Sequence, residues 1–125
     1  MKYTILGKNK SILYIESDDI LITDAQSALD LMATASYETN CRKLVLDKKA
    51  ICEEFFRLSS KIAGEVLQKF INFHIQLAII GDFSRYTSKP LHDFIYECNN
   101  GKDFFFVDNL EQAIEKLGSF YLESR

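Results

Sequence analysis

The chain has 125 residues, of which 47% are hydrophobic and 26% are charged, and its formal net charge at pH 7 is −3. This length suits one domain with its own core, and the composition excludes a disordered chain. Lysines and arginines are scattered along the sequence, so nucleic acid is not expected as a partner. No apolar run approaches the ~20 residues of a membrane span, and the first residues lack the apolar core of a signal peptide. The sequence therefore predicts one cytoplasmic domain over residues 1–125, without a membrane partner.

The first part of the chain predicts a β-hairpin, then a helix and a strand. Gly7 and Asn9 lie between two β-prone runs and favour a tight turn. Thr23 and Gln26 have the spacing of a capping box, in which each side chain accepts an amide hydrogen at the helix start. The expected elements are hairpin strands at 3–6 and 11–16, a short extended stretch at 20–22, a helix ending near Asn40, and a strand at 43–47.

The second part predicts alternating helices and buried strands after an irregular segment at 48–58. Phe55 and Phe56 are the apolar anchors of that segment, and Ser59 or Ser60 caps the helix that follows. Gly64 in this helix is interpreted as allowing close approach to the sheet. The remaining expected elements are a strand at 76–81, a helix through 91–98, a strand at 103–107, and a last helix with apolar positions at 110, 113, 114, 117 and 121.

This order favours a single sheet. Apolar strands separated by helices are typical of parallel pairing with right-handed crossovers, and the first strand adds an antiparallel edge. The predicted fold class is α/β: one mostly parallel sheet with an antiparallel edge hairpin and about four helices.

Acidic residues follow the predicted strands where they end. Asp47 is the last residue of its predicted strand, and Asp82 and Asp108 directly follow theirs. Ser17, Asp18 and Asp19 follow the hairpin. Parallel strands share a carboxyl edge, outside which ligands of open α/β sheets bind. An acidic pocket able to hold Mg²⁺ is one interpretation; the other is that these aspartates serve turns and helix caps.

The loop after the strand at 76–81 carries hydroxyls and cations just before a helix. Because amides at a helix start attract anions, a phosphate or carboxylate could dock here, although no P-loop motif is present. The alternative is that Thr87 or Ser88 caps the helix while Arg85 and Lys89 offset nearby aspartates. The candidate ligand-binding residues are Asp47, Asp82, Ser84, Arg85, Thr87, Ser88 and Lys89.

Ser59 and Ser60 are candidate phosphoacceptors, since added phosphate charge is stabilised at a helix start; plain capping is the alternative. The three cysteines form no C-x-x-C pair, and the two histidines have no metal-ligand spacing. No catalytic residue, metal ligand or cofactor is assigned from the sequence.

Three stretches resemble a bacterial family called domain of unknown function 4180: "SALDLMATASYETNC", "LSSKIAGEVLQKFINF" and "LAIIGDFSRYTSKPLHDFIYECNNGKDFFFV". The similarity extends from about Ile15 to Leu117, with Lys61 where that family is expected to have glycine. This family has no assigned activity. The order of elements also resembles the sulfate-transporter and anti-sigma-factor-antagonist domain, which implies protein partners and a switch by phosphorylation. The D-S-S-G-like signature of that domain is absent here.

Two functions are therefore expected as alternatives. The first is a non-enzymatic regulatory or protein-interaction domain with an unidentified protein partner, whose surface centres on residues 48–60 and 82–89. The second is a small anionic-ligand or nucleotide-binding domain at the carboxyl edge. An Mg²⁺-dependent phosphotransfer or hydrolase activity ranks third, because no lysine and hydroxyl stand at fixed spacing from the aspartates. Association with a second copy of the chain is left open by the sequence.

Overall fold

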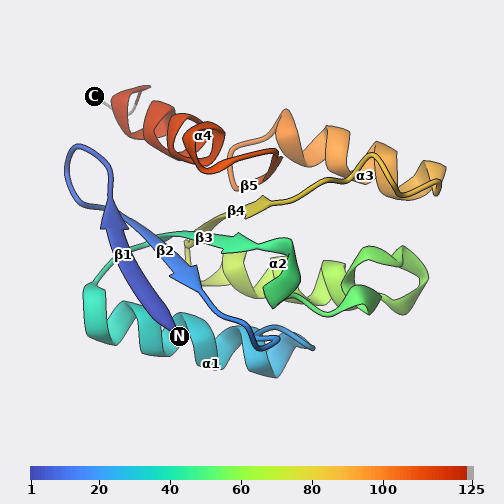
Figure 1. Ribbon diagram of the computed structural model, residues 1–125, viewed down its shortest axis with the longest axis horizontal. Coiled ribbons are helices and arrows are strands. Elements are labelled where there is room, and N and C mark those ends of the chain that lie inside the picture. The colour runs from blue at the N-terminus through green and yellow to red at the C-terminus, as the bar shows by residue number, and fades with distance from the viewer. Residues whose placement is uncertain (124–125) are drawn as a thin grey trace.

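The computed structural model describes residues 1–123 and has the predicted order of strands and helices (Figure 1). Three short 3₁₀ turns lie between β3 and α2. The elements are β1 (Lys2–Leu6), β2 (Ile12–Glu16), α1 (Ala25–Thr39), β3 (Lys43–Asp47), α2 (Ile62–Asn72), β4 (Gln76–Ile80), α3 (Lys89–Asn99), β5 (Phe104–Val107) and α4 (Leu110–Glu123).

The five strands form one sheet in the order β1-β2-β3-β4-β5. β1 pairs antiparallel with β2, and every later pairing is parallel. The hairpin turn forms as expected, because Gly7 has a positive φ of 92° and its carbonyl accepts a hydrogen bond from the Lys10 amide. The predicted α/β class, with a mostly parallel sheet and an antiparallel edge hairpin, is confirmed.

Helices cover both faces of the sheet. Each crossover carries the chain to the next strand in the same direction, so crossovers of one hand put α1, α2 and α3 on the same face. Leu31, Phe70 and Leu91 of these helices share one buried cluster with alternate strand residues. α4 packs on the opposite face through Ala113 and Leu117 (Figure 1). The carboxyl ends of the parallel strands therefore lie at one edge, between the two helical layers.

α1 begins one residue later than its predicted cap implies. Asp24 is the N-cap: its carboxylate accepts the Ser27 amide hydrogen at 2.8 Å, and the Ser27 hydroxyl accepts the Asp24 amide hydrogen at 3.1 Å. The capping box predicted at Thr23 and Gln26 is therefore wrong, because aspartate and serine three residues apart serve the same purpose. The C-terminal end is confirmed, since Asn40 caps α1 in the left-handed conformation.

Lys61 occupies a backbone position that glycine adopts more readily. Its φ is 67°, and it joins the 3₁₀ turn Leu58–Ser60 to the start of α2 without a side-chain cap. A side chain in this left-handed region costs roughly 1–2 kcal/mol. The resemblance expects glycine at this same position, and the backbone gives the physical reason for that expectation.

Gly64 does not lie against the sheet, which corrects the prediction. It is exposed on α2, and a Cβ added to it would meet nothing within 4 Å. Gly64→Ala is therefore expected to raise the free energy of unfolding by about 0.5–1 kcal/mol, because alanine loses less backbone entropy on folding. Urea unfolding measures this change. Gly81→Ala is the contrasting variant: its Cβ would lie 2.8 Å from the Lys48 Cβ, so it is expected to destabilise.

Candidate functional site

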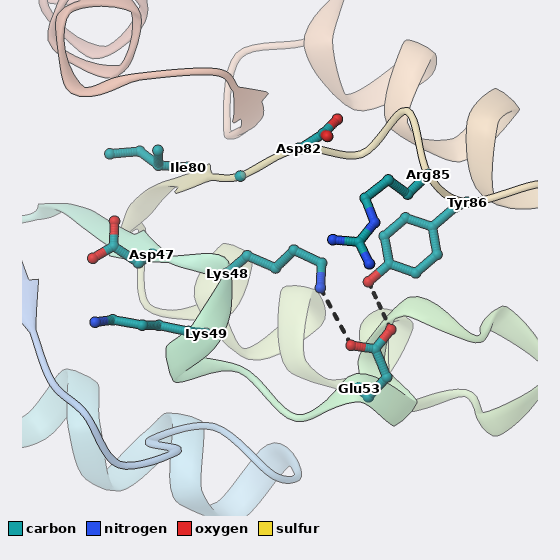
Figure 2. A pocket seen from close by; sticks show the side chains of 9 residues that line it. Asp47, Lys48, Lys49, Glu53, Ile80, Asp82, Arg85 and Tyr86 are labelled. Carbon is teal, nitrogen blue, oxygen red and sulfur yellow. Dashed lines mark hydrogen bonds and ion pairs between the residues drawn. The ribbon is translucent and has the colours of Figure 1, made fainter.

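A cavity of about 560 Å³ lies at the carboxyl ends of β3 and β4 (Figure 2). This volume is within the range of small-molecule sites, and the location is where open α/β sheets bind ligands. Its walls come from the strand ends, the 3₁₀ segment after β3, and the loop after β4. The lining residues are Asp47, Lys48, Lys49, Glu53, Ile80, Gly81, Asp82, Arg85 and Tyr86.

Gly81 allows the end of β4 to lie close to the end of β3 at the cavity floor. Its amide donates to the Val107 carbonyl at 2.9 Å, which extends the β4–β5 pairing by one residue past β4. Because a Cβ at Gly81 would lie 2.8 Å from the Cβ of Lys48, the absence of a side chain leaves room for the Lys48 stem. The lysine therefore crosses the floor of the cavity from the end of β3.

Aromatic rings join the two segments that wall the cavity. Phe56, on the 3₁₀ turn Glu53–Phe56, stacks on Tyr86 of the loop after β4, with ring centroids 5.5 Å apart and an interplanar angle of 20°. Phe83 of the same loop lies 5.9 Å from Phe56 and makes an edge contact with Phe106 of β5. Aromatic contacts between buried and half-buried rings of this kind fix the loop to the sheet and to the 3₁₀ segment.

Lys48 lies at the centre of a charged cluster. Its Nζ is 3.2 Å from Glu53 Oε1 and 5.1 Å from the ring centroids of both Phe56 and Tyr86. The Tyr86 hydroxyl donates to Glu53 Oε2 at 2.7 Å, so each oxygen of the Glu53 carboxylate has its own partner (Figure 2). The guanidinium of Arg85 extends into the same space from the loop.

These contacts shift the pKa values of Glu53, Lys48 and Tyr86. The hydrogen bond from Tyr86, helped by Lys48 and by the charge of Arg85, lowers the pKa of Glu53. Burial acts to lower the pKa of Lys48, but its hydrogen bonds to Tyr86 and Glu53 outweigh burial and raise it. Burial and the bond to Glu53 raise the pKa of Tyr86. At neutral pH the cluster therefore holds an ammonium, a carboxylate and a neutral phenol.

Two of the predicted aspartates line the cavity but direct their carboxylates away from this cluster (Figure 2). Asp47 accepts hydrogen bonds from the Tyr14 hydroxyl at 2.9 and 3.0 Å. Asp82 accepts from the amide and hydroxyl of Ser84 at 3.0 and 2.6 Å, and these bonds lower the pKa of Asp82. Asp82 thus acts as a turn residue, the alternative given for it from the sequence.

Of the loop residues predicted to bind a ligand after Asp82, only Arg85 lines the cavity, as Asp47 and Asp82 do. Ser88 caps α3, accepting the Leu91 amide hydrogen at 3.3 Å, and Lys89 pairs with Asp93 at 2.8 Å. Thr87 is exposed and faces a separate hollow. Capping and charge compensation, rather than the cavity, therefore account for Ser88 and Lys89.

The two candidate phosphoacceptors differ in their surroundings. The Ser60 hydroxyl donates to the Glu54 carbonyl at 2.7 Å and accepts the Ile62 amide hydrogen at 3.3 Å, whereas the Ser59 side chain is exposed. Ser60 therefore helps to start α2, although Lys61 holds the N-cap position itself.

The aspartates do not assemble into a metal centre. Within residues 1–123, no three or more His, Cys, Asp or Glu side chains are grouped so that they could hold a metal ion. Asp108 instead lies at the start of α4, where its amide donates to the Gln112 side chain at 2.9 Å. None of the helices within residues 1–123 is both long and apolar enough to cross a membrane.

Six residues of the cavity are absent from the predicted site residues: Ile80 and Gly81, and the four with charged or hydroxyl-bearing side chains, Lys48, Lys49, Glu53 and Tyr86. Lys48 and Lys49 directly follow β3, so the strand-end rule that selected Asp47 selects them as well. Tyr86 lies between Arg85 and Thr87, two residues that were predicted as ligand-binding, so its position in the loop was a signal for it. Glu53 has no such local signal, because the fold of the 3₁₀ segment alone brings it to Lys48.

The comparisons with known proteins identify a family and nothing further. The family model described as "Domain of unknown function (DUF4180)" matches residues 7–117, which include every residue of the cavity. No curated protein matches the chain, and no solved structure does.

Proposed function

The chain belongs to the DUF4180 family, whose description states no activity, and from the site we propose a binding domain that takes a small anionic ligand at the carboxyl edge of its sheet. One observation carries this proposal: the Arg85 guanidinium and the Lys48 ammonium enter one cavity of about 560 Å³.

The balance of charge inside the cavity supports an anion. The lining includes three cationic and three acidic side chains. The carboxylates of Asp47 and Asp82 are hydrogen-bonded to Tyr14 and Ser84 and point away from the cluster, and Lys49 pairs with Asp18 at 3.4 Å. The charges that remain in the cluster are those of Lys48, Glu53 and Arg85, two positive and one negative. Among residues 1–123, the Arg85 guanidinium has no hydrogen-bond or ion-pair partner. It offers five donors in a fork that matches carboxylate and phosphate oxygens.

Arg85→Ala is expected to weaken binding of such an anion at least tenfold, since a charge-assisted hydrogen bond contributes about 1.5–3 kcal/mol. Arg85 is exposed, so the variant should keep the fold. The measurement is thermal stability with a panel of nucleotides and phosphate compounds, where a ligand at a hundred times its Kd stabilises by about 2.7 kcal/mol.

Lys89→Ala is the matched control. This substitution also removes one positive charge from the same region of the chain, but Lys89 lies outside the cavity lining and pairs with Asp93. The control should bind like the wild type. Equal losses in the two variants would point to general charge attraction and not to this cavity, and a panel without any stabilising compound would remove the proposal.

A regulatory protein-interaction domain is the second candidate. Its support is that residues 48–60 and 82–89, far apart in sequence, are joined by Phe56 and Tyr86 into one surface at the sheet edge. The resemblance to the anti-sigma-factor-antagonist domain, which rests on the order of elements alone, would favour this second candidate. Phosphorylation of the exposed Ser59 would add charge to that surface.

Affinity capture tests this candidate with two baits, the wild-type chain and the double charge reversal Arg57→Glu and Arg85→Glu. Arg57 is exposed in the segment 48–60, and Arg85 is exposed in the segment 82–89. A partner retained by the wild type and lost by the charge-reversed bait would favour it. Identical retention of every protein by both baits would count against this surface.

A further inference from the structure

The Glu53 carboxylate already occupies the position of an anion in the cavity. One oxygen lies 3.2 Å from the Lys48 ammonium, and the other accepts the Tyr86 hydroxyl hydrogen at 2.7 Å. Arg85 lies close enough for its charge to lower the pKa of the same carboxylate. Two donors of the cavity are thus directed at a carboxylate that belongs to the chain itself, and the Arg85 guanidinium lies in the same space (Figure 2).

This carboxylate is placed so that it can be displaced. Glu53 is the first residue of a 3₁₀ turn and not part of a strand or long helix, and its side chain is 69% exposed. Exposed ion pairs contribute little to stability, so rotating Glu53 into solvent costs little free energy once another anion pairs with Lys48. Lys48 has less freedom, because its side chain is 27% exposed and lies over two aromatic rings.

We propose that Glu53 is an internal competitor that sets the charge of the ligand: the cavity selects a dianionic phosphoryl group, as in a phosphate ion or phosphate monoester, over a single carboxylate. This inference rests on the proposed anion-binding function. A tethered carboxylate has a high effective concentration at Lys48, so a free carboxylate of equal charge gains little by replacing it. A phosphoryl dianion carries more charge and three acceptor oxygens, enough for Lys48, Tyr86 and Arg85 together.

Isothermal titration at pH 8 tests this with inorganic phosphate, methyl phosphate and acetate as probes. Glu53→Gln removes the charge but keeps the shape, and Glu54→Gln is the matched control, since Glu54 neighbours Glu53 but does not line the cavity. Wild type and Glu54→Gln are expected to bind the phosphate probes and not acetate. Glu53→Gln is expected to bind phosphate at least fivefold more tightly and to bind acetate as well.

The outcomes separate the two proposals. Phosphate binding of equal strength in all three proteins would overturn the role of Glu53 and leave the anion site standing, and so would an equal gain in both glutamine variants. Absence of binding by all three proteins would remove the anion site itself. Tighter binding of inorganic phosphate would indicate a free phosphate ion as the ligand, and tighter binding of methyl phosphate would indicate a phosphate monoester.

Discussion

Phe56→Ala is expected to lower the free energy of unfolding by about 3–5 kcal/mol, the range for removing a buried phenylalanine. Phe56 is 3% exposed and packs against Phe55, Phe83 and Tyr86. Its loss leaves a cavity where the 3₁₀ segment meets the loop after β4, and it removes a ring from beneath the Lys48 ammonium. Urea unfolding measures the stability, and phosphate titration of the folded variant measures the site.

Phe70→Ala is the control for this variant. Phe70 is fully buried in α2 and contacts Phe104, on the same face of the sheet but outside the cavity lining. Both variants should lose similar stability, whereas only Phe56→Ala should weaken phosphate binding. Equal affinity of the two folded variants would show that the aromatic contact does not hold the site together.

Tyr14 is expected to make stability depend on pH in the alkaline range. Burial and the hydrogen bond to Asp47 raise the pKa of Tyr14 from 10.0 to about 12. A raised folded pKa means that the stabilisation is complete below pH 10 and is lost as pH rises through 12. The loss between pH 9 and pH 12 is expected to be about 2 kcal/mol, at 1.36 kcal/mol per unit of pKa difference.

Comparison of variants isolates this effect from other alkaline titrations. Tyr14→Phe should be less stable than the wild type at pH 9, and the difference should shrink by about 2 kcal/mol at pH 12. Tyr37→Phe is the control, since Tyr37 is 93% exposed on α1. A wild-type advantage that is the same at both pH values would contradict the role given to the Tyr14–Asp47 bond.

The fold was largely predictable because its signals are local. Strand β3 has the predicted bounds, while β4 and β5 are each one residue shorter than predicted. Buried parallel strands read as continuous apolar runs, and helices show their periodicity, so neither requires knowledge of distant contacts. The Thr23 and Gln26 error arose because two overlapping sets of residues satisfy the same capping rule.

The candidate site was predictable only in part, since its contacts are not local. The strand-end rule found Asp47 and the loop with Arg85, but it did not indicate that the two aspartates are bound by Tyr14 and Ser84. The contact between Glu53 and Tyr86 spans 33 positions of the sequence and depends on how the 3₁₀ segment folds. Gly64 was misread for a similar reason, because a glycine in a helix does not itself reveal what faces it.

The most direct test of the central claim is an amide-resolved NMR titration of the wild-type chain with inorganic phosphate. If an anion binds where Lys48 and Arg85 enter the cavity, the largest saturable shifts should fall on the amides of Lys48, Glu53, Gly81 and Arg85, while α1 stays unchanged. Saturable shifts centred away from these residues, or none up to millimolar phosphate, would contradict it.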